Sequence, residues 1–527
     1  MEYIIIQAGG KGTRLEHLTK NKPKALVPVE NLPMIFHLFR MFPDKKFIII
    51  ADYQREALRK YLRAFADVKY LVVDALGTGT ASGVKQALNL IPEKQPFMLV
   101  WSDLILPKNL ELPKGYKDVQ SYPEKIIDNS CLDNYVGIST TFPCRWKYEN
   151  GEFTEERSTE HGVAGFFLFK DKQEIIEVPE SGELVRWMQQ QKMNFKEISL
   201  AGTEEFGVLK EYEEIGVPKC RPFNKVTIKG DKFIKAPIDA QGVSLAQIEC
   251  AWYEKAKSMG VDVLPKIYST DPLTMEYING KNIYECNFDK DDKRKILEKL
   301  IAELNKLHQE EAIPTDYFSI SKAYFGKTID RLSKIQNLVP FGNNKTITVN
   351  GRECRNIFFH IDELEKRIEQ LTCSNFAFIH GDCTFSNLMI RENGEPVLID
   401  PRGYFGYTKL YGDVRYDWAK LYYSLIGNYD YFNLKDFTLD IGGRSVYTEF
   451  TEGEKPDLKE GEVLLSITSN NWEDMEKDFF ELTGADEYEI KLLHAIIWLS
   501  LTTYAWQDYD SVCGAFYNGL YYLEEVL

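Results

Sequence analysis

The stretch HGDCTFSNLMI, followed after a short turn by VLIDPRG, constrains the fold and chemistry of this chain more than any other feature. Asp382 and Asn387 lie five residues apart in it, and Asp400 follows on the next predicted strand. Phosphoryl transfer from ATP needs a carboxylate that orients the acceptor hydroxyl and oxygen ligands for the Mg²⁺ ions that bridge the phosphates. The spacing therefore predicts a kinase site that works without a covalent protein nucleophile.

This loop resembles the HGDxxxxN catalytic loop of the aminoglycoside phosphotransferase and choline kinase superfamily, with Asp400 in the position of the Asp of the kinase DFG motif. The resemblance implies that Asp382 orients the acceptor hydroxyl and that Asn387 and Asp400 hold Mg²⁺. The segment MEYINGKNI resembles the family's hinge between lobes, which implies adenine contacts at Glu276 and Ile278. We therefore expect a bilobal, protein-kinase-like α+β domain.

A lysine on an apolar strand face supplies a further candidate for this site. The segments KVTIK and KFIKA predict a hairpin whose register places Lys235 on such a face, where it needs a partner or an anionic ligand. An edge lysine that reaches water is the alternative. We expect the next helix to start at a capping box of Ser244 and Gln247 and to end at Gly260, with Glu249 beside its buried stripe. We predict that Glu249 pairs with Lys235 and holds this lysine where it binds ATP phosphates.

The N-terminal end of the chain carries a second nucleotide motif. A predicted buried strand at Tyr3–Ile6 runs into AGGKGTRL, and PKALVPV follows. Glycines let the backbone approach a phosphate closely, and the amides of such a loop form an anion-binding concavity, to which Arg14 and Lys24 add positive charge. A glycine-rich loop alone also occurs in ordinary tight turns. The candidate nucleotide-binding residues of the loop are Ala8, Gly9, Gly10, Gly12 and Thr13.

The combined pattern of GGKGTRL and PKALVPV resembles the signature of the sugar-phosphate nucleotidyltransferase family, which joins a phosphomonoester to a nucleoside triphosphate and releases pyrophosphate. The resemblance implies catalytic roles for Arg14 and Lys24. It also implies that Gly79 and Thr80 belong to the loop that receives the nucleobase and ribose. Gly165, in a predicted strand, either lets the phosphorylated portion of the acceptor approach or is structural.

The rest of this half predicts a mostly parallel, Rossmann-like α/β sheet. Short β-rich runs at 47–51, 70–73 and 97–101 alternate with helical patterns. Ligands of such sheets lie beyond the carboxyl ends of the strands, where Asp103 stands. The resemblance implies that Asp103 holds Mg²⁺. The family's second metal carboxylate comes from a DxGT motif, and in the corresponding segment EEFGVL its place is taken by Glu205, with the threonine absent.

Length and composition predict two domains that act on small molecules. A chain of 527 residues exceeds what one hydrophobic core supports, and we place a nucleotidyltransferase-like domain at 1–220 and a kinase-like domain at 221–527. A net charge of −16 disfavours nonspecific attraction to nucleic acid or anionic membranes. Nine cysteines without a CxxC pair favour reduced thiols in the cytoplasm, and the N-terminal apolar run is too short for a signal peptide or stable membrane insertion. The sequence is compatible with a homo-oligomer.

Together the halves imply two successive reactions, each dependent on Mg²⁺. The kinase phosphorylates a small hydroxyl compound with ATP, and the transferase couples the product to a second triphosphate, which is CTP, UTP, GTP or dTTP. We favour a sugar acceptor, and hence an activated sugar for surface glycan synthesis. Choline or ethanolamine with CTP is the alternative, for which an aromatic tail at 498–522 could cage the amine, although such residues are more often core. A third hypothesis makes one half a catalytically dead regulatory module.

Overall fold

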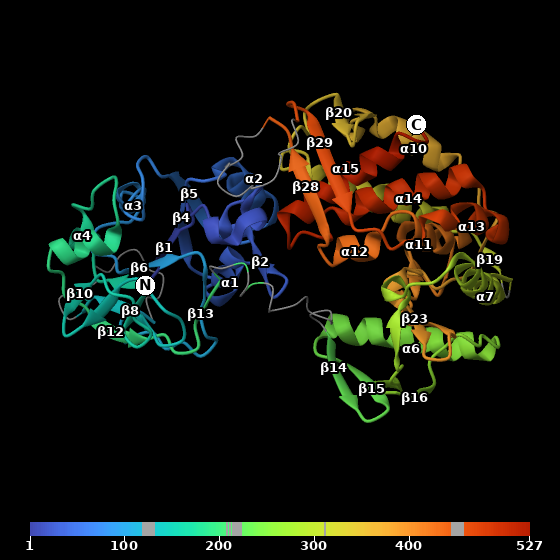
Figure 1. The fold of residues 1–527 in the computed structure, drawn as a ribbon, viewed down its shortest axis with the longest axis horizontal. Coiled ribbons are helices and arrows are strands. Elements are labelled where there is room, and N and C mark those ends of the chain that lie inside the picture. Colours follow the sequence, from blue (N-terminus) through green and yellow to red (C-terminus); the bar gives the residue numbers. More distant parts are fainter. Residues whose placement is uncertain (118–131, 207–208, 210–211, 213–223, 310–311, 444–457) are drawn as a thin grey trace. The chain divides into compact units, whose positions relative to one another are not determined.

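The computed structural model describes residues 1–117, 132–206, 209, 212, 224–309, 312–443 and 458–527 (Figure 1). Contacts divide the chain into two units, of which unit 1 consists mainly of Met1–Val217 and unit 2 of most of the remainder. The predicted boundary at 220/221 lies outside the described residues. Along the described ranges, no helix has the length and apolar character that crossing a bilayer takes.

A nine-stranded sheet forms the centre of unit 1 (Figure 1). The strands β6, β1, β4 and β5 run parallel to one another, whereas β11 is antiparallel to β6. The predicted α/β class with a parallel core is thus confirmed. The order is β10-β9-β11-β6-β1-β4-β5, with β8 on β11 and β12 on β8. The bounds are β1 Tyr3–Gln7, β4 Lys46–Ala51, β5 Lys69–Asp74, β6 Phe97–Trp101, β8 Tyr135–Ser139, β9 Lys147–Glu149, β10 Glu152–Thr154, β11 Gly162–Phe169 and β12 Lys196–Ser199.

Helices cover both faces of this sheet. Helices α3 (Val84–Leu88) and α4 (Leu184–Gln190) share an apolar core with Ile48 of β4. Because neighbouring strand residues point to opposite faces, Phe47 lies on the face opposite to Ile48. There its ring centre lies 4.8 Å from that of Phe39 in α1 (Met34–Met41). Helix α2 (Arg55–Phe65) packs against α1 through aromatic side chains. Helix α3 begins only after Gly83, because this residue adopts a φ of +80°.

Unit 2 begins with a four-stranded antiparallel sheet and one long helix, α6 (Ala240–Ser258). The predicted hairpin is confirmed, and Lys235 lies directly opposite Val226 in its register. The predicted capping box is wrong: the N-cap is Asp239, whose carboxylate accepts a hydrogen bond from the amide of Gly242 at 2.7 Å, and Ser244 lies inside the helix. The sheet order is β14 (Asn224–Lys229), β15 (Lys232–Pro237), β17 (Leu273–Glu276) and β16 (Ile267–Thr270).

A mostly helical lobe follows, so the kinase-like α+β class is confirmed (Figure 1). A hairpin of β23 (Leu388–Arg391) and β24 (Pro396–Leu398) separates Asn387 from Asp400. The helices are α7 Lys290–Gln309, α8 Tyr317–Ile320, α9 Lys327–Ile335, α10 Ile361–Glu369, α11 Val414–Leu425, α12 Tyr429–Asn433, α13 Glu476–Thr483, α14 Glu487–Leu501 and α15 Tyr509–Leu523. The other strands of this part are β18 Gly280–Asn282, β19 Ile313–Pro314, β20 Thr346–Val349, β21 Arg352–Arg355, β22 Asn375–Phe378, β25 Tyr404–Phe405, β26 Thr408–Lys409, β27 Tyr411–Gly412, β28 Phe437–Ile441 and β29 Glu462–Ile467.

Candidate active sites

The glycine-rich loop of unit 1 leaves the carboxyl end of β1, as expected for a ligand site of a parallel sheet. The amide of Ala8 donates to the carbonyl of Ile50 at 3.0 Å, so the amides left for an anion are those of the more exposed residues that follow. Gly12 has a φ of +66°, and a Cβ there would lie 3.1 Å from Cβ of Lys24. The glycine therefore lets the loop pack tightly against the lysine of the second motif.

Lys24 and Asp103 form a buried ion pair between the two motifs. The Lys24 ammonium lies 2.5 Å from one carboxylate oxygen of Asp103, and the two side chains are 10% and 15% exposed. The other carboxylate oxygen of Asp103 is buried and has no hydrogen-bond partner among the described residues. An orphaned buried carboxylate oxygen needs a donor or a cation. Asp103 therefore fits the magnesium site that the resemblance implies.

The second metal candidate stands on a strand that pairs with the strand directly after Asp103. Glu205 in β13 (Glu204–Glu205) is paired with Leu104, the residue after Asp103, in β7 (Leu104–Ile105). Arg14 reaches the Glu205 carboxylate at 3.6 Å. No group of three metal-ligating side chains occurs in the described part of the chain. This is compatible with Mg²⁺, which commonly takes one or two carboxylates and completes its shell with water and phosphate oxygens.

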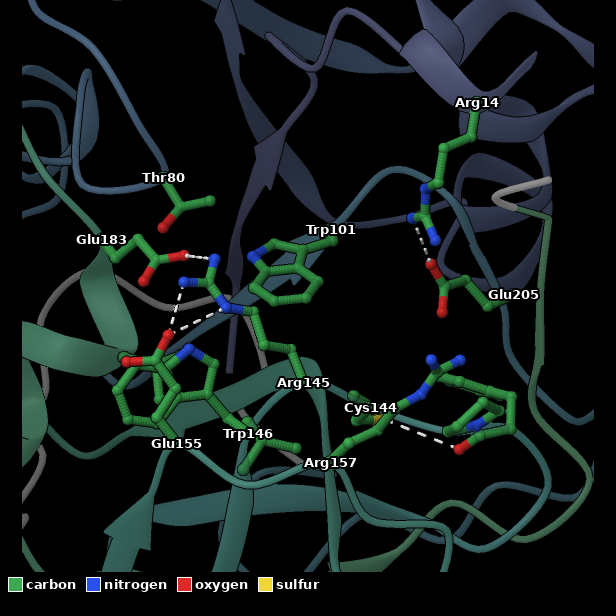
Figure 2. A pocket seen from close by; sticks show the side chains of 15 residues that line it. Arg14, Thr80, Trp101, Cys144, Arg145, Trp146, Glu155, Arg157, Glu183 and Glu205 are labelled. Atoms are coloured by element: carbon green, nitrogen blue, oxygen red, sulfur yellow. Dashed lines mark hydrogen bonds and ion pairs between the residues drawn. The ribbon is translucent and has the colours of Figure 1, made fainter.

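A cavity of about 530 Å³ opens beside these residues (Figure 2). Thr80, Arg14 and Glu205 line it, as the sequence predicts for a substrate site. Its floor also contains Trp101 and Arg145, which sequence reasoning missed. Figure 2 shows Arg145 held between two glutamates, at 2.5 Å from Glu155 and 2.6 Å from Glu183.

Gly165 leaves space for the ring of Trp101, which lines this cavity. It has a φ of +81°, and a Cβ at this position would lie 2.0 Å from the Trp101 ring. The indole therefore lies flat against the backbone of β11, which favours the structural role of the glycine over the approach of an acceptor. The indole N–H of Trp101 has no hydrogen-bond partner among the described residues.

We expect Gly165→Ala to destabilise unit 1 by at least about 2 kcal/mol more than Gly202→Ala does. Gly202 has the same backbone strain, with a φ of +83°, but its added Cβ would meet only Cβ of Pro107 at 3.7 Å. Both variants carry the left-handed cost, and only the first collides with an aromatic ring. Thermal unfolding of the two variants of the full chain measures the difference. Equal losses would show that Trp101 moves aside without cost.

In unit 2, the HGD loop brings Asp382 and Asn387 together. The Asn387 amide donates to the Asp382 backbone carbonyl at 2.9 Å and to its carboxylate at 3.2 Å. Lys420 of α11, which the sequence did not single out, lies 2.9 Å from the Asp382 carboxylate. The charge of the candidate base is thus balanced by a lysine from a helix 38 positions further along the chain.

A buried aspartate of α11 holds the HGD loop in place. Asp417 accepts hydrogen bonds from the amides of His380 and Gly381 at 2.8 and 2.6 Å and from His308 at 3.0 Å. His380 is fully buried, and its Nε2 donates to the carbonyl of Ile399 at 3.1 Å. Burial lowers the pKa of His380, which keeps the ring neutral. These contacts assign His380 to bracing the loop, not to proton exchange.

The predicted pair of Lys235 and Glu249 is confirmed. The Lys235 ammonium lies 2.9 Å from the Glu249 carboxylate and 2.6 Å from that of Asp400. Two carboxylates therefore share one ammonium group. Burial raises the pKa of Glu249 to about 7, and the neighbouring charge of Asp400 raises it in the same direction.

The raised pKa of Glu249 predicts that the stability of the folded state decreases as the pH rises. Glu249 keeps its proton in the folded state up to a pH of about 7, whereas the unfolded chain releases it near 4.5, so the stabilising contribution is lost as the pH rises between these values. We expect the melting temperature of Glu249→Gln to rise relative to the wild type between pH 5 and pH 8, corresponding to roughly 1–3 kcal/mol. Glu254→Gln, at an exposed position of the same helix, is the matched control. A constant difference across this range would contradict the shifted pKa.

The hinge candidates lie where the sheet passes into the helical lobe. Glu276 is the last residue of β17, and its side chain forms an ion pair with Arg391. Its amide donates to the carbonyl of Lys266 at 2.9 Å. Ile278 is buried. Any adenine contact of Glu276 would therefore come from its backbone carbonyl, because its carboxylate and its amide are already engaged.

Some of the kinase candidates line one cavity of about 250 Å³, whereas Asn387, Glu276 and Ile278 are not among its lining residues. Lys235, Asp382 and Asp400 all line it. From the aromatic tail, Tyr504 reaches this lining, whereas Trp498 is fully buried. Glu249, which the sequence predicted at this site, also lines it. The remaining lining residues with charged or aromatic side chains are Lys327, Arg331, Arg402, Tyr404, Tyr416, Lys420, Tyr423 and Tyr429.

Comparison with known families agrees with this division. Residues 3–140 match the nucleotidyl transferase family, and residues 266–433 match the phosphotransferase enzyme family. The chain thus carries a nucleotidyl transferase domain followed by a kinase-like phosphotransferase domain, and the predicted fusion is confirmed.

Known proteins are similar to parts of this chain. The bifunctional protein GlmU of Methanococcus maripaludis is 31% identical over 128 residues, which are 24% of this chain and 30% of the relative. UTP–glucose-1-phosphate uridylyltransferase AglF of Haloferax volcanii is 29% identical over 175 residues, which are 31% of this chain and 70% of the relative. The crystal structure of HddC from Yersinia pseudotuberculosis covers 41% of this chain and 98% of its own, with 19% identity and a TM-score of 0.33. The chain therefore spans less than a third of the length of the GlmU relative.

Proposed function

We propose that this chain is a bifunctional enzyme of the cytoplasm that phosphorylates a small hydroxyl compound with ATP and then couples the phosphomonoester to a nucleoside triphosphate. The observation that carries the kinase step is the convergence of Lys235, Asp382 and Asp400 on one cavity. For the second step, the buried pair of Lys24 and Asp103 beside the glycine-rich loop is the main support.

In the kinase step, Asp382 accepts the hydrogen bond of the acceptor hydroxyl and takes its proton as the oxygen attacks the γ-phosphorus of ATP. The new bond joins the acceptor oxygen to phosphorus, and the bond between the γ-phosphorus and the bridging oxygen breaks to leave ADP. Lys235, oriented by Glu249, binds the phosphates. Asn387 and Asp400 would hold Mg²⁺, which neutralises phosphate charge when bound.

In the transferase step, an oxygen of the phosphomonoester attacks the α-phosphorus of the second triphosphate in line, and pyrophosphate leaves. The backbone amides of the glycine-rich loop bind the triphosphate, and Arg14 and Lys24 stabilise the charge that develops. Asp103 and Glu205 would hold Mg²⁺, which supplies further charge stabilisation at the α-phosphate when bound. No protein group needs to become covalently attached.

We favour a sugar as the acceptor, for surface glycan synthesis. Trp101 and Trp146 line the cavity of unit 1, and flat aromatic faces suit sugar rings. The amino-alcohol alternative is less well supported, because a quaternary amine would enter a kinase cavity lined by five cationic side chains. A catalytically dead half is also less well supported, because both sites keep their carboxylates and lysines in contact.

One experiment tests this proposal. The full chain is incubated with ATP, Mg²⁺, one of CTP, UTP, GTP or dTTP, and a panel of sugars and amino alcohols, and products are identified by mass. We expect ADP, pyrophosphate and a nucleoside diphosphate conjugate of one sugar. Consumption of ATP only with choline or ethanolamine would favour the alternative. Absence of ATP consumption with every acceptor would refute the kinase step.

A further inference from the structure

The kinase cavity carries more positive charge than its catalytic groups use. Five cationic side chains and three carboxylates line it. Lys235 is paired with Glu249 and Asp400, and Lys420 is paired with Asp382, so all three carboxylates already have a cationic partner. The three other cations are Lys327, Arg331 and Arg402.

These three cations have no carboxylate partner among the residues that the structure describes. The Arg402 guanidinium donates to the hydroxyls of Tyr416 and Tyr404 at 2.9 and 3.1 Å. Arg331 donates to the backbone carbonyl of Ser500. The ammonium group of Lys327 lies 5.8 Å from the ring centre of Tyr416, and within the described ranges it has no hydrogen bond or ion pair.

The positions of two of these cations separate them from the ATP side of the cavity. Lys327 and Arg331 stand one turn apart on α9, so they lie on the same face of that helix. The helix follows a π-helical turn at Ser321–Gly326, a deviation that often accompanies functional sites. Arg331 contacts the end of α14, whereas the cluster of Lys235 is built from β15, α6 and the segment after β24. An anion beside α9 would therefore belong to the acceptor.

Three unpaired cations in a half-buried cavity repel one another. Burial lowers the pKa of Lys327, and the charges of Arg402, Arg331 and Lys420 lower it further. Burial and the charge of Arg402 also lower the pKa of Arg331. A bound anion would relieve both the desolvation and the repulsion, because charge-assisted bonds to phosphate or carboxylate replace the lost hydration.

We propose that the acceptor of the kinase domain is itself an anion: a polyhydroxy compound that carries a phosphate or carboxylate group in addition to the hydroxyl that is phosphorylated. Lys327 and Arg331 bind the anionic group. The proposal rests on the kinase step proposed above, and it narrows the class of substrate. A neutral or cationic acceptor would leave the three cations uncompensated.

The first test compares matched acceptors with the full chain, ATP and Mg²⁺. The pairs are hexose and hexose 6-phosphate, and glycerol and glycerol 3-phosphate or glycerate, with choline as the cationic member. We expect kcat/KM to be at least about tenfold higher for the anionic member of the pair that is used, the factor expected for one charge-assisted contact of about 1.4 kcal/mol. Equal or better use of a neutral or cationic member would overturn the anionic acceptor and leave the kinase activity intact.

The second test does not need turnover. Binding of inorganic phosphate is measured by calorimetry with Mg·ADP in excess, in the wild type, in Lys327→Met, in Arg331→Gln and in Lys334→Met, an exposed control on the same helix. We expect the two cavity variants to weaken phosphate binding at least about fivefold and the control to leave it unchanged. Phosphate binding that is absent, or that is equal in all four proteins, would overturn the inference even if the proposed kinase step fails for another reason.

Discussion

Asp382→Asn is expected to slow phosphoryl transfer from ATP by about 10²–10⁴-fold, the range for removal of a positioned acid–base group. The amide keeps the shape of the carboxylate and can still contact Asn387, but it cannot take the proton of the acceptor hydroxyl. It also removes the negative charge that balances the Lys420 ammonium, which lies 2.9 Å from the Asp382 carboxylate in the wild type. Release of pyrophosphate from a supplied phosphomonoester should not change, because the transferase site lies in the other unit.

Two measurements distinguish a loss of the chemical step from a loss of the folded cavity. ADP formation and pyrophosphate release are assayed separately, and binding of Mg·ADP is measured to show that the cavity is intact. Asp362→Asn, an exposed aspartate in the first turn of α10, is the matched control and should retain both activities. Undiminished ADP formation in Asp382→Asn would eliminate this residue as the group that orients the acceptor, and it would revive the hypothesis of a catalytically dead half.

Lys24→Met is expected to lower the rate of nucleotidyl transfer by about 10²–10³-fold, comparable to the loss of one preorganised donor to a developing charge. The same substitution leaves Asp103 buried without its partner at 2.5 Å, which should destabilise unit 1 by about 3–5 kcal/mol. ATP consumption by the kinase domain should be unaffected. Pyrophosphate release and thermal unfolding of the full chain measure the two effects.

A double variant separates the loss of activity from the loss of stability. Lys24→Met combined with Asp103→Asn removes both charges, so it should recover most of the melting temperature without recovering activity. Lys85→Met, at an exposed position of α3, controls for the loss of a lysine. Recovery of pyrophosphate release in the double variant would show that the pair is structural and that Lys24 plays no part in the transition state.

Much of both sites could be predicted because their residues stand close together in the sequence or on regular elements. Asp382 and Asn387 belong to one loop, and a hairpin of fixed register places Lys235 on the apolar face of its sheet. The helical period then puts Glu249 beside the buried stripe of α6, and the ion pair forms as expected. The capping prediction failed because a Ser-x-x-Gln pattern also occurs inside helices, and Asp239 was the stronger cap.

The sequence by itself determined the two nucleotide motifs, the class of each domain and the local pairs, since strand and helix periods translate directly into faces. Only the tertiary structure decided that Lys327, Arg331 and Lys420 converge on the cavity of Asp382. These residues come from helices that are distant in the sequence, and a basic residue on an amphipathic helix looks the same whether its face meets water or a cavity. Their meeting depends on how the helices pack, and no local period in the sequence encodes that arrangement.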